Sequence, residues 1–201
     1  KHIKTTDGWI IRSGTILDSK IIDKASNLSV IGRAGVGVDN IDISAATRKG
    51  IVVMNTPDAN TISAAEHTMA LILALSRNVS FGHIELLKGK WNRQMLIGSE
   101  LHGKTIGIVG LGKIGREVMR RSKAFNMQIL GYDPFIPDDF FREDEIEICD
   151  FEYLIKKSDF ITLHIPLTND TKNLFDYGSL VKMKKEARII NVARGGIINE
   201  N

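Results

Sequence analysis

The stretch TIGIVGLGKIG, at residues 105–115, decides the fold of this chain. Its first five residues are apolar and mostly β-branched, which is typical of a buried parallel strand. Residues 116–125 then have the pattern of a helix, and residues 127–132 have that of a second strand, which ends at Asp133. The helix is expected to bury the side formed by Val118, Met119 and Phe125.

The three glycines that follow the first strand match a turn that holds a dinucleotide. Gly110 allows a sharp turn, Gly112 lets the backbone approach a pyrophosphate, and Gly115 lets the helix pack against the strand. The helix N-terminus offers N–H groups to the phosphates. Asp133, 18 residues after Gly115, is placed to accept both hydroxyls of an adenosine ribose and would repel a 2′-phosphate. The pattern therefore favours NAD over NADP, the alternative being a structural glycine turn in another α/β protein.

The composition is that of an intracellular globular protein. The chain has 201 residues, 43% of them hydrophobic, and a net charge of +3 in which basic and acidic residues are interleaved. It has no basic stripe for a nucleic acid, no apolar run long enough to span a membrane, and one cysteine, Cys149. We therefore expect a soluble, cytoplasmic protein without a nucleic-acid, membrane or metal partner. Because the sequence starts without methionine and stops where a new element should begin, we expect it to be part of a longer protein.

Strand and helix patterns alternate along the whole chain. Before residue 57, strands are predicted at 8–13, 28–32 and 51–54, with helices at 18–25 and 43–49. After the glycine turn, strands are predicted at 160–165 and 188–192, helices at 151–157 and 179–185, and an irregular segment with a short helix at 134–149. This alternation predicts an α/β fold with a doubly wound parallel sheet. We expect an NAD-binding Rossmann domain at 57–201, incomplete at its C-terminus, and part of a smaller flavodoxin-like α/β substrate domain at 1–56.

The region between these two parts points to self-association. Residues 55–60 have turn composition and are expected to cross between the domains. Helices are predicted at 61–77 and 81–90, and the first is apolar nearly all round from Met69 to Leu75. Such a helix needs cover on more than one side, so we expect a homodimer or homotetramer.

Four motifs in collinear order resemble the NAD-dependent D-isomer-specific 2-hydroxyacid dehydrogenases. They are GRAGVGVDNID at 32–42, SAAEH at 63–67, GLGKIG at 110–115 with YDP at 132–134, and NVARGG at 191–196. In that family a discontinuous substrate domain and a cofactor domain close over a cleft. The likeness covers nearly the whole chain and is strongest to members that oxidise 3-phosphoglycerate to 3-phosphooxypyruvate, the first step of phosphorylated serine biosynthesis.

The resemblance implies roles for particular residues. Val36 and Gly37 would offer backbone N–H groups to the substrate carboxylate, and Val36 would also approach the nicotinamide. Arg194 would bind the carboxylate and the keto oxygen beside the cofactor. The other residues implied at the cofactor are Lys113, Ile114, Ile165, Val192 and Ala193.

Arg194 also has a chemical rationale that does not depend on the family. Oxidation of a secondary alcohol needs a base for the hydroxyl proton and a cation where the oxygen gains negative charge. A guanidinium pairs with a carboxylate through two hydrogen bonds, and a loop after a sheet strand lies where ligands bind in such folds. The alternative is a surface arginine in a Gly-Gly turn.

The family's acid/base pair, a histidine and a glutamate that holds its protonation state, lies after the arginine motif and so outside these residues. His164 matches a position beside the cofactor and is expected to be a polar residue at the sheet edge. His67 is expected to be packed or capping, and no constellation surrounds His2, His83 or His102. We therefore assign no acid/base residue within this chain.

Three arginines are candidates for binding a substrate phosphate: Arg12 at a strand end, Arg33 beside the glycine loop, and Arg93 after Trp91. They match arginines on the substrate side of the phosphoglycerate-oxidising members, the alternative being scattered surface charges. A small phosphorylated 2-hydroxy acid is therefore the expected substrate. Two other functions stay open: a hydroxypyruvate or glyoxylate reductase, and a non-catalytic NAD-sensing module similar to the corepressors related to this family.

Overall fold

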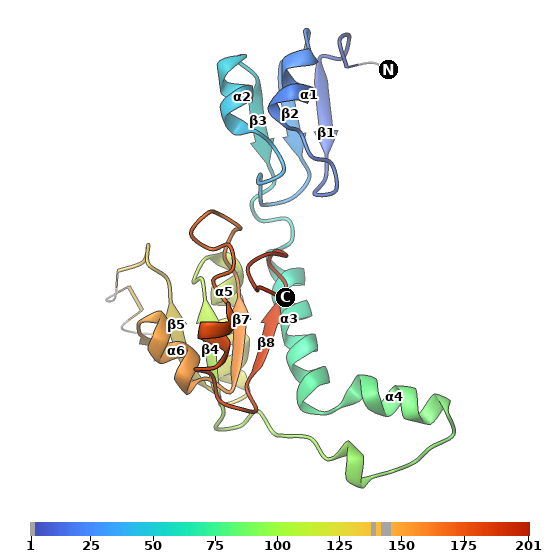
Figure 1. The fold of residues 1–201 in the computed structure, drawn as a ribbon, viewed down its shortest axis with the longest axis vertical. Coiled ribbons are helices and arrows are strands. Elements are labelled where there is room, and N and C mark those ends of the chain that lie inside the picture. Colours follow the sequence, from blue (N-terminus) through green and yellow to red (C-terminus); the bar gives the residue numbers. More distant parts are fainter. Residues whose placement is uncertain (1–2, 138–139, 142–145) are drawn as a thin grey trace. The chain divides into compact units, whose positions relative to one another are not determined.

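The computed structural model describes residues 3–137, 140–141 and 146–201. The chain folds into two compact units, Lys1–Asn60 (unit 1) and Thr61–Asn201 (unit 2), and each is described by itself (Figure 1). The expected domain boundary at residue 56 lies four residues before this division. Both units are built on parallel sheets.

Unit 1 contains a three-stranded sheet. Its strands, β1 (Gly8–Ile11), β2 (Val30–Arg33) and β3 (Val52–Asn55), lie in the order β1-β2-β3. The register pairs Ile11 with Arg33, and Arg33 with Asn55. Because the strands are parallel, their carboxyl ends meet at one edge of the sheet.

Two helices of unit 1, α1 (Ser19–Lys24) and α2 (Ile43–Arg48), are each started by an aspartate. Asp18 accepts a hydrogen bond from the Ile21 N–H, and Asp42 accepts one from the Ala45 N–H. The helices and strands share one core, formed by Ile11, Leu17, Ile22, Ala25, Leu28, Ile31, Ile41, Ala45, Ala46 and Ile51.

The end of α2 also holds the end of α1. α2 stops as expected at Gly50, which is left-handed with a φ of 68°. The preceding Lys49 reaches across to α1, where its ammonium donates to the carbonyls of Ile22, Asp23 and Ala25 at 2.9–3.0 Å. One lysine therefore satisfies the last carbonyls of α1 and joins the two helices.

Unit 2 contains a five-stranded parallel sheet with the order β6-β5-β4-β7-β8. The chain runs outward from β4 to β6 and then returns to the other side of β4 with β7, so the strand order reverses between β4 and β7. This doubly wound α/β arrangement places ligands at the point of reversal, and it confirms the predicted fold class. The strands are β4 (Thr105–Val109), β5 (Gln128–Tyr132), β6 (Glu147–Ile148), β7 (Phe160–Leu163) and β8 (Arg188–Asn191).

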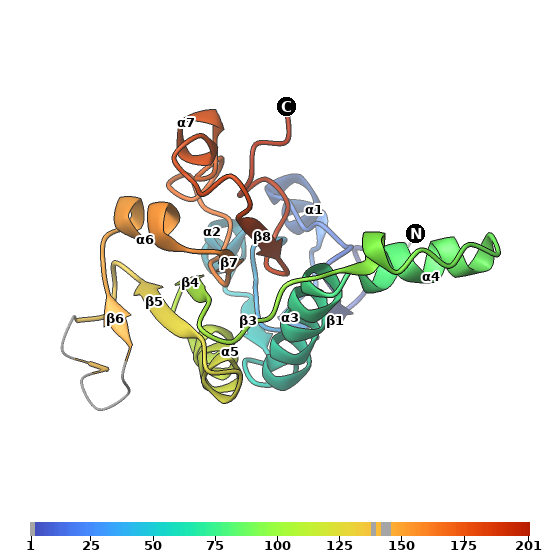
Figure 2. The same ribbon diagram turned by 90° about the horizontal axis from the view of Figure 1, so that it is seen from below.

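Helices cover both faces of this sheet (Figure 2). Ile106 and Ile108 of β4 belong to the core shared with α3 and α5, whereas Gly107 faces α6. A side chain at Gly107 would collide with Leu154 and Ser158, so the glycine lets α6 pack closely on the sheet. These helices are α3 (Thr61–Ser76), α5 (Lys113–Ala124) and α6 (Phe151–Lys157).

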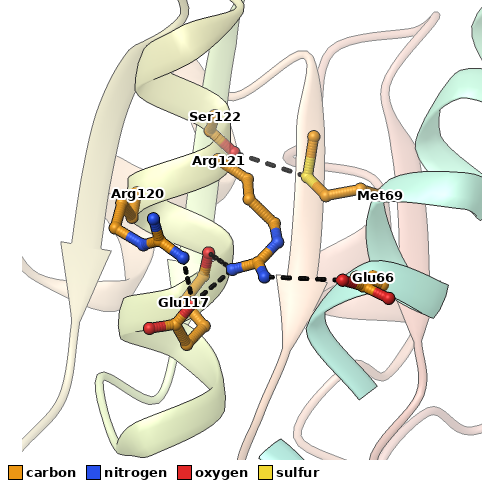
Figure 3. Close-up of polar contacts among 6 residues, drawn as sticks. All are labelled: Glu66, Met69, Glu117, Arg120, Arg121 and Ser122. Carbon is orange, nitrogen blue, oxygen red and sulfur yellow. Dashed lines mark hydrogen bonds and ion pairs between the residues drawn. The ribbon is translucent and has the colours of Figure 1, made fainter. Parts of the chain in front are cut away.

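The contact between α3 and α5 combines polar and apolar groups (Figure 3). Arg121 of α5 pairs with Glu117 one turn earlier and lies 3.8 Å from Glu66 of α3. Beside it, the Ser122 hydroxyl lies 3.9 Å from the Met69 sulfur. Partly exposed ion pairs contribute little free energy, so the buried apolar side chains supply most of the stability of this contact.

A largely exposed arm, residues 79–97, extends from the end of α3 (Figure 1). It contains α4 (Val79–Leu87) and the 3-10 turn η1 (Gln94–Leu96), neither of which has a buried residue. Leu73 and Leu75 of α3 are also exposed in the single chain, as expected for a helix that needs further cover. The exposed apolar residues of the arm are Val79, Phe81, Ile84, Leu86, Leu87, Trp91, Met95 and Ile97.

Three expectations for the elements of unit 2 differ most from the structure. The short helix expected within 134–149 is replaced, among its described residues, by the edge strand β6, and residues 138–139 and 142–145 lie outside the description. The helix expected at 179–185 is instead α7 (Tyr177–Leu180), because Asp176 caps it by accepting a hydrogen bond from the Ser179 N–H. Phe125 is 38% exposed because α5 ends one residue before it.

Candidate functional site

The groups assigned to the cofactor meet at the carboxyl edge of the unit 2 sheet. The glycine turn at 110–115 follows β4, Asp133 follows β5, Ile165 lies just beyond β7, and residues 192–194 follow β8. Because all five strands are parallel, these segments share one edge. The edge includes the point where strand order reverses, which is where doubly wound sheets bind ligands.

Gly110 shapes the turn in a way that only glycine allows. Its φ is 93°, and its N–H donates to the Tyr132 carbonyl at 2.8 Å, which joins the turn to the end of β5. A Cβ at this position would lie 2.7 Å from the His164 carbonyl oxygen and 2.8 Å from Ile165. The turn therefore needs glycine for both conformation and space.

The other two glycines of the turn have different surroundings. A Cβ at Gly115 would collide with the Gly110 carbonyl oxygen, so α5 approaches the turn as closely as the dinucleotide motif requires. At Gly112 a Cβ would meet nothing within 4 Å, although the residue directly precedes the first turn of α5. Open space over bare backbone, at the start of a 12-residue helix, fits a pyrophosphate.

The Asp133 carboxylate lies at the tip of β5 beside the same turn. Its Oδ2 accepts a hydrogen bond from the Leu111 N–H at 2.9 Å, and its Oδ1 accepts one from the Phe135 N–H at 3.0 Å. Each carboxylate oxygen has a further lone pair, so both can also accept a ribose hydroxyl. Asp133 therefore orders the glycine turn and presents acceptors for a sugar.

Apolar side chains complete this edge. Ile114 and Val192 pack against the core on the α3–α5 side, and Ile165 and Ala193 pack against the core on the α6 side. Lys113 is exposed in the first turn of α5. Acceptors for a ribose, an open helix start and partly buried apolar residues together fit the chemistry of NAD.

One asparagine shapes the loop that carries Arg194. Asn191, the last residue of β8, accepts hydrogen bonds on Oδ1 from the N–H groups of Ala193 at 3.0 Å and Arg194 at 3.3 Å. Its Nδ2 donates to the Arg194 carbonyl at 2.7 Å. The Arg194 guanidinium donates from Nη1 to the Ala193 carbonyl at 2.8 Å. The Arg194 side chain is half-buried on the carboxyl edge.

His164 does not have the setting of an acid/base residue. It lies half-buried one residue after β7, and its backbone N–H donates to the Val109 carbonyl at 2.8 Å. Burial lowers the pKa of His164 to about 4, so the ring is neutral at neutral pH. Its Nε2 is buried and has no hydrogen-bond partner in the part of the chain that the structure describes. His164 is a polar residue at the sheet edge, as expected.

The other histidines lie apart from this edge. His67, expected to be packed or capping, is instead exposed in the middle of α3, because the buried side of that helix is formed by its neighbours Ala65, Thr68 and Met69. His83 is exposed on α4, and His102 is exposed before β4. His2 lies outside the described residues.

Cys149 has no catalytic setting. Burial raises the pKa of its thiol to about 11, and the neighbouring carboxylates of Glu147 and Asp150 add to the effect, so the thiol stays protonated.

Among the described residues, no three His, Cys, Asp or Glu side chains are grouped as metal ligands. No single helix of the described ranges is long and apolar enough to cross a membrane, and α3 and α4, which reach that length together, are bent by 63°.

In unit 1, Arg12 and Arg33 lie at neighbouring strand ends. Arg12 directly follows β1 and is exposed, whereas Arg33 ends β2 and is buried. The Arg33 guanidinium lies over Gly35, which has a φ of 149° and leaves the space for it. Within the described residues the Arg33 Nε has no hydrogen-bond partner. A buried guanidinium with an unpaired N–H is the kind of group that a bound anion would satisfy.

Two further asparagines hold the loops of unit 1. Asn40 donates from Nδ2 to the carbonyls of Arg12 at 3.1 Å and Thr15 at 2.6 Å. Asn55, at the end of β3, donates to the Val36 carbonyl at 2.7 Å. The loop that carries Val36 and Gly37 is therefore held at the same edge as Arg12.

Arg93 lies in a different part of unit 2. It lines a hollow of about 360 Å³ with Arg77, Ser99 and Glu100, beside the end of α3. Ser99 accepts a hydrogen bond from Arg188, the first residue of β8, so the hollow lies at the amino ends of the strands. Within unit 2, the structure does not bring Arg93 to the carboxyl edge that holds Arg194.

Three asparagines that hold these loops, Asn40, Asn55 and Asn191, were not among the site residues predicted from the sequence. Asparagine amides commonly bond backbone groups two or three residues away, and only Asn191, which ends a strand before a glycine-rich loop, fits that pattern. Asn40 and Asn55 bond carbonyls that are distant in sequence.

Comparison with known proteins gives three findings. Residues 69–201 match the family described as D-isomer specific 2-hydroxyacid dehydrogenase, NAD binding domain. The D-3-phosphoglycerate dehydrogenase of Methanocaldococcus jannaschii is 51% identical over 201 residues, which is 100% of this chain and 38% of that relative. The D-3-phosphoglycerate dehydrogenase of Bacillus subtilis is 45% identical over 199 residues, or 99% of this chain and 38% of the relative. The chain thus spans little more than a third of the length of these curated relatives.

A solved structure agrees with the fold. The NAD-dependent formate dehydrogenase from Staphylococcus aureus, in complex with NAD, matches with a TM-score of 0.91 and 38% sequence identity. The match covers 98% of this chain and 60% of that one.

Proposed function

Because the chain belongs to the D-isomer specific 2-hydroxyacid dehydrogenase family and contains its NAD-binding domain, we propose that the full-length protein oxidises 3-phosphoglycerate to 3-phosphooxypyruvate. When bound, NAD accepts the hydride from the carbon that carries the hydroxyl group. The observation that carries the proposal is one sheet edge on which the glycine turn, Asp133 and Arg194 follow three parallel strands. The reaction would be the first step of phosphorylated serine biosynthesis.

The cofactor would lie along the carboxyl edge of unit 2. The first turn of α5 would hold the pyrophosphate, and Asp133 would accept the ribose hydroxyls. Val36 of unit 1 would approach the nicotinamide end. The full proposed set is Val36, Gly110, Gly112, Lys113, Ile114, Gly115, Asp133, Ile165, Val192, Ala193 and Arg194.

Arg194 would orient the substrate. Its guanidinium would bind the carboxylate and stabilise negative charge on the oxygen of the reacting carbon, while the N–H groups of Val36 and Gly37 would bind the same carboxylate. The hydroxyl proton would pass to the histidine of the family's acid/base pair, which lies beyond the arginine motif. No residue that the structure describes in this chain has the setting of that base.

The substrate phosphate would be bound by arginines. Arg12 and Arg33 support this part of the proposal, because they lie at neighbouring strand ends and Arg33 has a buried, unpaired N–H in the described part of the chain. The high identity to D-3-phosphoglycerate dehydrogenases supports it as well. Arg93 remains a candidate from sequence.

The phosphate site can be tested by comparing two substrates. We expect Arg12→Gln and Arg33→Lys, in the full-length protein, to raise the KM for 3-phosphoglycerate by about 10–100-fold, the effect of losing a charge-assisted hydrogen bond. The KM for hydroxypyruvate or glyoxylate, measured in the reverse direction, should change less than about twofold, since these substrates have no phosphate. Arg48→Gln, an exposed arginine on α2, is the matched control. Equal effects on both substrates would favour the hydroxypyruvate or glyoxylate reductase instead.

The non-catalytic alternative has its own discriminating result. A full-length protein that binds NAD, but yields no NADH with 3-phosphoglycerate or other 2-hydroxy acids, would be an NAD-sensing module similar to a corepressor. The gene sequence beyond residue 201 also separates the enzyme from the NAD-sensing module. The family's glutamate and histidine would be present in the enzyme and absent from the module.

We also infer a homodimer or homotetramer in the cytoplasm. The apolar side chains exposed on α4 and on the outer side of α3 support self-association, because monomers rarely expose so many together. We propose that the same arm of a second copy of the chain packs against these apolar side chains. Light scattering should give at least twice the mass of one chain, and Ile84→Glu with Leu87→Glu should lower it. A monomeric wild-type mass would contradict the inference.

A further inference from the structure

The loop that carries Arg194 takes its shape from a residue that the proposed reaction does not otherwise use. The Asn191 side chain bonds three backbone groups in the next three residues: two N–H groups, of Ala193 and Arg194, and the Arg194 carbonyl. Asn191 uses its acceptor and its donor on one short turn. A serine or an aspartate would satisfy only part of this set.

These bonds fix the backbone of Arg194, from which its side chain extends. Asn191 pairs with Leu163 in the sheet, so the amide is held on a rigid frame. Both the N–H and the carbonyl of Arg194 are bonded to that amide, which sets the direction of its Cα–Cβ bond. The next residues are Gly195 and Gly196, which impose little conformation of their own. The hydrogen bonds of the Asn191 side chain therefore provide the main restraint on the Arg194 backbone.

The guanidinium needs such a restraint. Arginine has a long side chain with many rotamers, so fixing it in one orientation costs conformational entropy. In this structure the guanidinium is already held near its own turn by the bond from Nη1 to the Ala193 carbonyl at 2.8 Å. A group that must meet both a carboxylate and a developing oxyanion loses much of its effect when displaced by about 1 Å.

We propose that Asn191 is a positioning residue, which orients Arg194 toward the reacting carbonyl through the three backbone hydrogen bonds of the 191–194 turn. This inference rests on the proposed oxidation of a 2-hydroxy acid. A role in folding alone would have a different signature: stability, NAD affinity and turnover would fall together. A positioning role lowers the rate of the hydride step much more than it lowers NAD affinity, because Ala193 and Arg194 are only a small part of the proposed cofactor set.

Three substitutions in the full-length protein separate these roles. Asn191→Ala removes all three bonds. Asn191→Ser keeps an acceptor for the N–H groups, and Asn191→Asp keeps the acceptor but turns a second oxygen toward the Arg194 carbonyl. Asn126→Asp is the matched control, since Asn126 is exposed and lies in the turn between α5 and β5, at the amino ends of the strands.

Asn191→Ala should lower kcat/KM for the hydroxy acid by about 10–100-fold, while the Kd for NAD changes less than about threefold. Asn191→Ser should recover part of the loss, and Asn191→Asp should not. With substrate deuterated at the reacting carbon, the isotope effect on kcat/KM should rise in Asn191→Ala, because hydride transfer becomes more rate-limiting. If Asn191→Ala does not fold, Asn191→Ser and Asn191→Asp carry the same comparison.

Activity within twofold of wild type in Asn191→Ala overturns the inference, as does a Kd for NAD that rises in parallel with the loss of turnover. A wild-type protein that gives no NADH with any 2-hydroxy acid overturns the proposed function instead. The two failures are therefore told apart by the wild-type reaction.

Discussion

The Asp133 carboxylate accepts a hydrogen bond from the Leu111 N–H at 2.9 Å, so the tip of β5 is joined to the glycine turn after β4. Asp133 is expected to bind the ribose hydroxyls, and through this bond it also orders the glycine turn that is expected to hold the pyrophosphate. Asp133→Asn keeps an acceptor for Leu111 but loses the charge. We expect the Kd for NAD to rise by about 10–100-fold, as for loss of charge-assisted hydrogen bonds, and the preference for NAD over NADP to fall.

Calorimetric titration with both cofactors checks this, with Glu186→Gln, an exposed acid before β8, as the control. An equal loss of affinity for NAD and NADP would mean that the carboxylate orders the turn and does not discriminate at the ribose.

Gly112 and Gly115 should respond differently to the same added methyl group. Gly115→Ala should destabilise the domain by about 1–3 kcal/mol, because its Cβ collides with the Gly110 carbonyl. Gly112→Ala should leave stability near wild type, since its Cβ meets open space, and should weaken NAD binding by about tenfold or more. Urea unfolding and calorimetry measure the two effects. If Gly112→Ala bound NAD like wild type, the pyrophosphate would have to lie elsewhere.

His164 should make the stability of unit 2 depend on pH. Burial lowers its pKa from 6.5 to about 4, so the unfolded chain binds a proton between these values that the folded chain does not. The free energy of unfolding therefore includes the full contribution of the neutral ring above pH 6.5. As the pH falls toward 4, this free energy decreases by up to about 3 kcal/mol. His164→Gln should remove this part of the pH dependence, and His67→Gln, at an exposed site, should not. Parallel curves for wild type and His164→Gln would show that the ring is solvated.

Lys49 should stabilise unit 1 through the end of α1. Its ammonium bonds three carbonyls there, so Lys49→Met should cost about 1–2 kcal/mol and speed hydrogen exchange in α1. Lys20→Met removes an exposed lysine from α1 itself and should change neither. Similar results for both variants would mean that the three bonds contribute nothing beyond general charge.

The bounds of an element could be predicted from sequence where they depend on neighbouring residues and not on pairing with a distant strand. β4 and α6 begin and end at the predicted residues, because a β-branched apolar run before glycines and an Asp-capped amphipathic segment carry their own boundaries. β6 could not be predicted, since two residues form a strand only by pairing with β5. α7 starts earlier than expected because the Asp176 cap sets its first turn.

The candidate site divides in the same way. The glycine turn and Asp133 were found from spacing, and the structure places them on one edge. The bonds of Asn191 to the Arg194 loop depend on a turn that follows β8, so the sequence indicates that Asn191 can bond nearby backbone but not which groups it bonds. Arg93 was proposed from the resemblance, and within unit 2 it lies at the amino ends of the strands, so its part in phosphate binding stays a prediction.

Arg194 is the residue on which the proposed oxidation depends most directly. The measurement is the initial rate of NADH formation from 3-phosphoglycerate by the full-length wild type and by Arg194→Gln, together with the Kd of each for NAD. We expect an active wild type and a loss of about 100–1,000-fold in kcat/KM in the variant, with a much smaller change in Kd, because the guanidinium acts where charge develops. A wild type that forms no NADH, or an Arg194→Gln variant that keeps its rate, would contradict the account.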